Sequence, residues 1–317
     1  MAAEGRSGKL TFRVINNSAA FIGGDLIYHF VNFLAGILIA RSLGTEVYGQ
    51  FSFIFVYLSF FEILTQFGLN SVLTRRLAQT KEDAPQLLGN ALLLRLALII
   101  ASLPLALLVI RGMGYPVSVQ QGVFLASFQL FLALRSIYET IFRVNLSMIY
   151  PALWNGLRAL LNLSLVGAAV YLHPSIFIFI LAYLVSGLAA FAGLALFSRN
   201  FIRITFRPDW QLIRCLIKDS VPLLVAGYLT LLYCRIDVLM LSKMKGFAEI
   251  GYYSVATRLT EPLDMIAGSL TISLLPLLSR AFKEERGDFD EFSSKAFLGL
   301  LLVGLPLPSA GPSSQRI

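Results

Sequence analysis

The strongest constraint on this chain is a series of eight apolar stretches, each long enough to cross a membrane as a helix. A helix needs about 20 mostly apolar residues to cross a hydrocarbon core of about 30 Å. Backbone groups in lipid must satisfy their own hydrogen bonds, and these stretches do not alternate in polarity, so each predicts a helix. The predicted spans are Ser18–Ala40, Phe51–Leu69, Leu87–Ile110, Val119–Phe142, Met148–Leu172, Pro174–Ser198, Val221–Leu241 and Gly251–Leu278.

The composition supports this interpretation and excludes other classes of protein. Only 14% of the residues are charged, whereas a soluble domain carries roughly 25%. The net charge of +8 is spread between the apolar stretches, so no nucleic-acid partner is expected. Cys215 and Cys234 form neither a disulfide framework nor a metal-ligand pattern, and no cofactor is expected. We predict an all-α polytopic transmembrane helix bundle.

The basic residues predict how the chain is oriented. The N-terminal tail and the loops after the second, fourth, sixth and eighth spans carry 16 Lys and Arg, whereas the other loops carry 4. Because Lys and Arg accumulate in cytoplasmic loops, this asymmetry predicts a cytoplasmic N-terminus.

The loops on the other side are all short, which leaves no room for a catalytic domain outside the membrane. No GxxxxGK[ST] phosphate loop and no HExxH pair occurs in the sequence. We therefore do not expect an enzyme.

The connector between the sixth and seventh spans, Arg199–Ser220, differs from the other loops. Trp210, Ile213 and Ile217 share one helical face, whereas Arg214 lies on the polar side. This pattern predicts a short basic amphipathic helix that lies in the cytoplasmic interface. An ordinary solvated loop is the alternative.

An internal repeat relates the loops after the first and seventh spans. These loops read LGTEVYGQFSF and KGFAEIGYYSV, and Gly44 and Gly49 match Gly246 and Gly251 at a constant offset of 202 residues. Six spans separate the copies, so both repeats have the same orientation in the membrane. Two parallel halves around an axis along the membrane normal are typical of transporters.

Two regions carry a family resemblance. The stretches ARSLGTEVYGQFSF and FGLNSVLTRRLAQ, together with YCRIDVLMLSKMKGFAEIGYYSVATRL and SLLPLLSRAF, resemble helices one, two, seven and eight of Wzx-type oligosaccharide flippases. These flippases belong to the superfamily that also holds the lipid II flippase and the multidrug/toxin extruders. The resemblance implies two six-helix lobes around a cavity that opens alternately to each leaflet.

Family members have twelve or fourteen spans, whereas this sequence predicts eight and a remnant, Ala296–Leu307, that is too short to cross the bilayer. We therefore expect a C-terminally truncated member with an incomplete second lobe. The expected parts are a cytoplasmic tail, a first lobe, a basic connector, a partial second lobe and an atypical polar tail, at residues 1–17, 18–198, 199–220, 221–307 and 308–317.

The resemblance implies a multi-pass protein of the plasma (inner) membrane that flips a polyprenyl-pyrophosphate-linked oligosaccharide from the inner to the outer leaflet. Its implied partners are that lipid-linked oligosaccharide, membrane lipids and a coupling cation, H+ or Na+. Two alternatives stay open. One is a cation-coupled multidrug extruder of the same fold, and the other is an inactive truncated remnant.

Eleven ionisable side chains fall within the apolar stretches. Each would cost roughly 2.5–3.5 kcal/mol at the bilayer centre, so we expect them to face a protein interior, a wet cavity or the headgroups. The eleven are Asp25, Glu62, Arg95, Arg135, Glu139, Arg158, Arg235, Asp237, Arg258, Glu261 and Asp264.

Several of these groups have a helical spacing. Asp25 and Asn32 lie seven residues apart on one polar stripe of the first span, which also includes His29. Asn155, Arg158 and Asn162 form a similar stripe on the fifth span.

Two interpretations of these charges remain. In one, arginines neutralise the pyrophosphate of the substrate, because guanidinium stays charged and binds phosphate in a forked geometry. The acids would then orient the arginines, accept sugar hydroxyls or bind the coupling cation. In the other, pairs such as Arg135–Glu139 and Arg258–Glu261 hold helices together, or charges near span ends reach water. The candidate substrate-binding residues are Arg158, Arg235, Asp25, Asp237, Arg135, Glu139, Arg258 and Glu261.

Overall fold

A computed structural model of the chain describes residues 2–79, 83–145, 147–202 and 204–260, with side chains described for Gly24 and, within these ranges, from Ile27 onward. The chain divides into two compact units, Met1–Ser254 and Val255–Ile317, and each is described by itself. The described ranges contain helices and no strand, so the predicted all-α class is confirmed.

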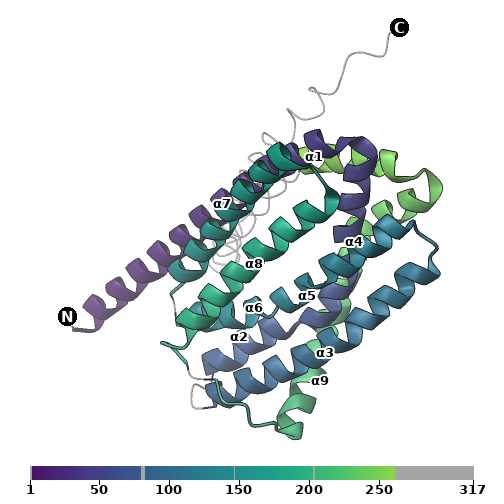
Figure 1. The fold of residues 1–317 in the computed structure, drawn as a ribbon. Helices are drawn as coiled ribbons and strands as arrows, with labels where there is room; N and C mark the ends of the chain where they lie inside the picture. The colour runs from purple at the N-terminus through teal and green to yellow at the C-terminus, as the bar shows by residue number, and fades with distance from the viewer. Residues whose placement is uncertain (1, 80–82, 146, 203, 261–317) are drawn as a thin grey trace, which may run out of the picture. The chain divides into compact units, whose positions relative to one another are not determined.

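The helices labelled in Figure 1 all belong to the first unit. They are α1 (Ala2–Gln66), α2 (Leu69–Gln79), α3 (Ala84–Gly112), α4 (Val117–Ser127), α5 (Gln129–Leu132), α6 (Arg135–Val144), α7 (Ile149–Leu172), α8 (Ile176–Ser198) and α9 (Trp210–Met244). Residues 247–260 are helical as well.

Six helical segments among the described residues are long and apolar enough to cross a membrane. One of them, Ile27–Gln79, has 53 residues. Its length of about 80 Å is more than twice the hydrocarbon core, so it accommodates two of the predicted spans. The six segments thus account for the first seven predicted spans, and the eighth, Gly251–Leu278, lies mostly outside the described residues.

Gly44 separates the first two spans. Its φ of 74° and ψ of 171° fall in a region of backbone conformation that is essentially restricted to glycine. The residue interrupts the helical backbone of α1, and Figure 1 shows the chain reversing direction there. The glycine therefore converts what would be one very long helix into two arms.

The sequence predicts one regular helix for the fourth span, Val119–Phe142. The structure instead has three shorter helices in series there, α4, α5 and α6. At its centre the amide of Phe131 donates to the carbonyl of Phe128, and the amide of Leu134 donates to that of Phe131, each at 3.1 Å. These bonds reach back three residues instead of four, which tightens the helix locally. Hydropathy alone does not detect such a change.

The amphipathic helix predicted within Arg199–Ser220 is present, but it is not separate from the next span. It is the first part of the 35-residue helix α9, which begins after Asp209. The Asp209 carboxylate caps the helix by accepting from the amides of Gln211 and Leu212, at 2.9 and 3.2 Å. Pro222 lies inside α9, close to the start of the apolar stretch, and does not end the helix, because it removes only one intrahelical bond.

The chain just before α9 is held against the start of α3. The side-chain amide of Asn90 donates to the carbonyl of Arg207 at 2.9 Å, and its oxygen accepts from the amide of Asp209 at 2.8 Å. A Cβ on Gly89 would lie 2.1 Å from the carbonyl oxygen of Thr205, so only glycine fits there. Residues 205–209, which we call the strap, are therefore packed against α3 and hydrogen-bonded to it.

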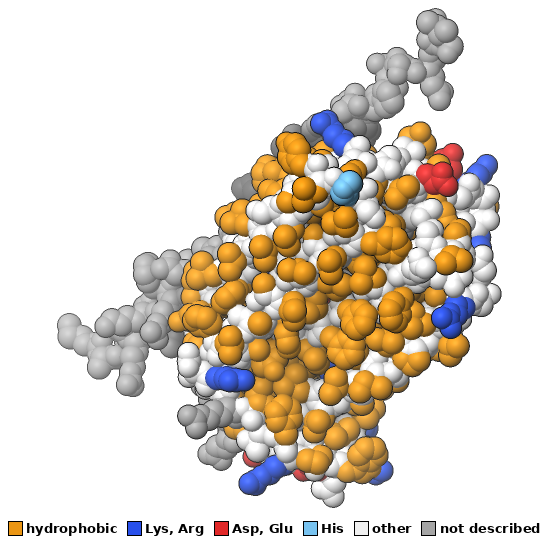
Figure 2. Space-filling model, viewed as in Figure 1, with side chains coloured by type: hydrophobic (Ala, Val, Ile, Leu, Met, Phe, Trp, Pro, Cys, Tyr) orange, Lys and Arg blue, Asp and Glu red, His pale blue; other side chains and the backbone are white. Residues whose placement is uncertain are grey.

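Two apolar clusters form the interior of the first unit. The larger one joins α1 to α3, α4, α7, α8 and α9, and its fully buried members include Phe53, Ile54, Val123 and Ile180. The smaller one joins α2 to α3, α6 and the start of α9. Outside these clusters, long apolar side chains such as Leu108 and Leu172 are largely exposed, as lipid-facing residues are. Figure 2 shows one such face, which is mostly hydrophobic with few charged side chains.

Candidate functional site

A polar cavity of about 170 Å³ lies among five helices of the first unit, α1, α5, α6, α7 and α8. It adjoins the tightened part of the fourth span, which supplies five of its residues. The lining residues are Glu62, Gln66, Gln129, Leu132, Ala133, Arg135, Ser136, Arg158 and Tyr183. We call this the polar cavity.

Arg158 of α7 lines the polar cavity and forms no close ion pair with a described residue, although Glu62 lines the same cavity. Its guanidinium carbon lies 4.9 Å from the ring centre of Tyr183 and 5.8 Å from that of Tyr28. Ring faces attract a cation without neutralising its charge. The charge of Arg158 therefore remains available to an anion that enters the cavity.

Arg135 already has its partners. Its Nη2 lies 3.1 Å from Oε1 of Glu139, which confirms the i, i+4 pair predicted from the sequence. Its Nη1 donates to Oδ1 of Asn155 at 2.7 Å, so α6 is fixed to α7. Both side chains of the ion pair are about one-fifth exposed. This arginine is held in place at the cavity wall.

A third arginine, Arg95 of α3, lies behind the wall and is fully buried. Its Nη1 donates to Oγ of Ser136 at 2.5 Å and to Oδ1 of Asn70 at 3.3 Å. Its Nε and Nη2 find no hydrogen-bond acceptor among the described residues. Among the described residues the three arginines outnumber the two nearby glutamates, Glu62 and Glu139, so the described part of this region has an excess of positive charge.

The polar stripes predicted on the first and fifth spans meet. Asn162 of α7 donates from its amide nitrogen to Oδ1 of Asn32 of α1 at 3.3 Å. Asn155 and Asn162 are buried, as expected for groups that avoid lipid, whereas His29 is exposed. The backbone of Asp25 is helical, but its side chain lies outside the described part of the structure.

Arg235 and Asp237 do not belong to the lining of the polar cavity. Arg235 and Asp237 lie on α9, where Asp237 accepts from the hydroxyl of Tyr253 and from the amide of Val238. Arg258 belongs to the second unit, and Glu261 lies outside the described residues. Of the eight predicted residues, the structure therefore brings Arg158, Arg135 and Glu139 together.

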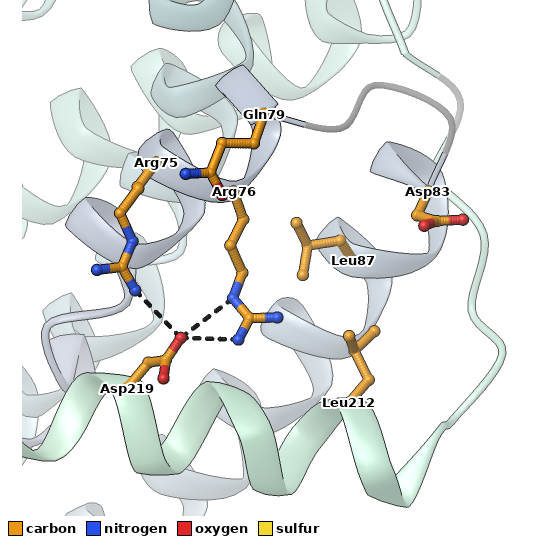
Figure 3. Close-up of a pocket in the computed structure, with 7 residues that line it drawn as sticks. All are labelled: Arg75, Arg76, Gln79, Asp83, Leu87, Leu212 and Asp219. Atoms are coloured by element: carbon orange, nitrogen blue, oxygen red, sulfur yellow. Dashed lines mark hydrogen bonds and ion pairs between the residues drawn. The ribbon is translucent and has the colours of Figure 1, made fainter.

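A second polar pocket, of about 340 Å³, lies where α2 and the start of α3 meet the start of α9. Figure 3 shows Arg75 and Arg76 pointing toward Asp219. Arg76 approaches Oδ2 of Asp219 with Nη2 at 2.7 Å and Nε at 3.2 Å, and Arg75 approaches it with Nη2 at 3.2 Å. Arg76 also contacts the sulfur of Cys215 at 2.8 Å. We call this the ion-pair pocket.

Asp219 lies outside the membrane-spanning part of α9, because it precedes the apolar stretch Val221–Leu241. The two guanidinium groups lower the pKa of its carboxyl below the ordinary value of 3.8. The carboxylate is therefore charged throughout the neutral range, and it ties α9 to α2. The sequence did not predict this site, since Asp219 is about 143 positions from Arg76 and only the fold brings them together.

Comparisons with known proteins agree with a transporter fold. Residues 14–282 match the family described as "Polysaccharide biosynthesis protein". No curated protein matches the chain.

Several solved structures are similar to this chain. A MOP superfamily transporter from Pyrococcus furiosus, whose pocket of reverse polarity suggests a different function, is 19% identical with a TM-score of 0.62, over 93% of this chain and 70% of that one. The inward-facing conformation of a multidrug resistance MATE family transporter is 20% identical with a TM-score of 0.68, over 88% and 68% of the two chains. The outward-facing conformation of a multidrug resistance MATE family transporter is 18% identical with a TM-score of 0.62, over 93% of this chain and 70% of that one. At these identities the likeness concerns the fold alone.

Proposed function

Because the chain belongs to the polysaccharide biosynthesis protein family, we propose that it moves a polyprenyl-pyrophosphate-linked oligosaccharide across the membrane by alternating access. That it is a multi-pass membrane transporter follows from the family and from the membrane-spanning helices. The substrate and the mechanism are the proposal. The observation that carries it is Arg158, a half-buried cation in the polar cavity that forms no close ion pair with a described residue.

The chemistry of the polar cavity suits a phosphate group. A guanidinium group stays charged at any physiological pH and offers paired donors that match phosphate oxygens. Arg158 would meet the pyrophosphate directly, and Arg95 would add positive charge from behind the wall through Ser136. Sites that enclose a drug-sized molecule measure about 300–1,000 Å³, so a cavity of about 170 Å³ would hold the charged group and not the glycan.

We further propose that the substrate travels from the inner to the outer leaflet of the plasma membrane and that the N-terminus is cytoplasmic, in line with the distribution of Lys and Arg. Residues 18–198 and 221–307 would act as two lobes joined by the connector 199–220. A coupling cation, H+ or Na+, would drive the cycle. Glu62, which lines the polar cavity, would bind that cation.

The test is export of a lipid-linked oligosaccharide by the purified chain in proteoliposomes. Arg158→Gln is expected to reduce the initial rate at least about tenfold, because hydrogen bonds to charged groups contribute about 1.5–3 kcal/mol each. Arg111→Gln is the matched control, since Arg111 lies in the last turn of α3 and does not line the polar cavity. A normal rate for Arg158→Gln would contradict the proposal.

The structural neighbours favour a second candidate, a multidrug extruder, because two of them are multidrug resistance transporters. A pocket for cationic drugs would need an excess of acids, whereas the described lining of the polar cavity holds Arg135 and Arg158 and, as its acid, Glu62. Extrusion of a cationic dye by the same proteoliposomes, unaffected by Arg158→Gln, would favour the extruder. Transport of neither compound would indicate an inactive chain.

A further inference from the structure

The two glycine motifs of the internal repeat contact each other through their backbones. A Cβ on Gly49 would lie 1.8 Å from the carbonyl oxygen of Phe247, and a Cβ on Gly251 would lie 2.0 Å from the carbonyl oxygen of Thr45. Both distances are far below any that a real Cβ makes with a neighbouring atom. Each glycine is therefore required by the backbone of the other motif.

This contact is reciprocal in the sequence. The offset of 202 residues that relates Gly49 to Gly251 also relates Thr45 to Phe247. Each glycine thus packs against the residue four positions before the other glycine, which is the pattern of a local two-fold relation. We call this contact, made by Thr45, Gly49, Phe247 and Gly251, the glycine clasp.

Side chains next to the glycine clasp join the end of α9 to a third region, the turn between α3 and α4. The hydroxyls of Tyr115 and Ser242 share a hydrogen bond of 2.7 Å. Lys243 donates to the carbonyl of Met113 at 2.5 Å, and its ammonium lies 4.0 Å from the ring centre of Tyr115. The ring of Phe247 lies 6.0 Å from the same ring, measured between centroids. The end of α9 is thereby attached to the turn between α3 and α4.

The glycine clasp lies at the end of α9 opposite to the strap. Figure 1 shows the kink of α1 and the end of α9 on the same side of the bundle, away from the start of α9. Below it, Val238 of α9 is only 3% exposed and belongs to the larger apolar cluster with residues of α1 and α4. The clasp therefore joins the end of α9 to α1 next to a tightly packed part of the apolar cluster.

We propose that the glycine clasp is a releasable seal between the two repeats, which must open when the transporter exposes its interior on that side. This inference rests on the proposed alternating-access function. Two backbones in contact at glycines can separate and meet again without interlocked side chains, which suits a contact that breaks in every cycle. The same sequence motif appears twice because each copy supplies one half of the seal.

The test measures access to position 238 from the side of the clasp. The reporter is Val238→Cys in a full-length chain that carries Cys215→Ser and Cys234→Ser, treated in proteoliposomes with a membrane-impermeant maleimide. Gly49→Ala and Gly251→Ala each force the backbones apart. Overpacking of a close contact shifts an equilibrium by about tenfold or more, so each variant is expected to raise the labelling rate about tenfold.

Gly167→Ala in α7 is the matched control, since a Cβ there meets no atom within 4 Å, and it should leave labelling unchanged. Unchanged labelling in either clasp variant would overturn the inference. If the alanine variants do not insert, Tyr115→Phe removes one supporting hydrogen bond and should raise labelling about threefold, and no rise would overturn it as well.

This readout is independent of the substrate. Unchanged labelling in a chain that exports oligosaccharide would reject the clasp and leave the transport proposal standing. Raised labelling in a chain that exports nothing would support the clasp and reject the transport proposal.

Discussion

The polar cavity and the ion-pair pocket use the same kind of residue under opposite conditions. In the ion-pair pocket two arginines converge on one carboxylate, and Arg75 is 61% exposed. At the polar cavity Arg95 is fully buried, and Arg158 is held by aromatic rings without a close ion pair among the described residues. The paired charges of the ion-pair pocket hold helices together, whereas we propose that the unpaired charges at the polar cavity bind the substrate. The difference can be tested from both sides.

The largest expected effect comes from Arg95→Met. Ser136 donates to Oδ1 of Asn70 at 3.0 Å, so these partners stay satisfied after the arginine is removed. Arg95 has no ion-pair partner in the described part of the chain, so loss of its buried charge should leave the melting temperature unchanged or raise it. Transport should nevertheless fall at least about tenfold, if the charge strengthens a substrate contact by about 1.5 kcal/mol or more. A parallel loss of stability and transport would mean that Arg95 is structural.

A smaller effect is expected where the polar stripes of α1 and α7 meet. A double-mutant cycle with Asn32→Ala and Asn162→Ala should give a coupling of about 0.6 kcal/mol, and at most about 1.7, as found for hydrogen bonds between membrane helices. Thermal unfolding in detergent micelles measures it. A coupling of zero would show that the 3.3 Å hydrogen bond between Asn162 and Asn32 does not contribute to the free energy of unfolding.

A still smaller effect is expected in the ion-pair pocket. Asp219→Asn should lower the melting temperature slightly, because exposed ion pairs contribute little. The difference should vanish in about 1 M salt, where the screening length is about 3 Å. Exchange of the charges, with Arg76→Asp and Asp219→Arg, should restore part of the loss. If the effect persists in high salt, the pocket is less accessible to water than the structure indicates.

The smallest effect concerns pH. Arg75 and Arg76 lower the pKa of Asp219 below 3.8, so its contribution to stability is present above that value and declines only as pH falls through the lowered pKa. The stability difference between the unmodified chain and Asp219→Asn should therefore be constant from about pH 5 to pH 8. A change within that range, followed by thermal unfolding in buffers of equal ionic strength, would contradict the assigned contact.

Features that depend on one helix could be predicted from the sequence. The spans follow from apolar length, and the Arg135–Glu139 pair follows from a four-residue spacing. The repeat was also visible, because Gly49 and Gly251 stand at matching positions. Each of these features can be found from the order of residues alone, without knowledge of how the helices pack.

Features that depend on how helices pack could not be predicted. Nothing near Gly49 in the sequence indicates that it touches Phe247, and nothing near Asp219 indicates Arg76. The tightened turns around Phe131 are likewise invisible to hydropathy, because the residues remain apolar. Arg158 lines the polar cavity, but the two tyrosine rings next to it come from other helices and could not be inferred from its own helix.

The contacts of the strap before α9 restrict where a reporter protein can be inserted into this chain. A linker between two halves is the usual choice, yet insertions are tolerated only where the backbone is free of buried contacts. Here a domain placed near Thr205 would pull the chain away from Gly89 and Asn90 and would uncap α9. The turn between α7 and α8 is the better choice, since residues 173–174 are exposed. A fluorescent tag at that turn would follow the protein in cells without disturbing either end of α9.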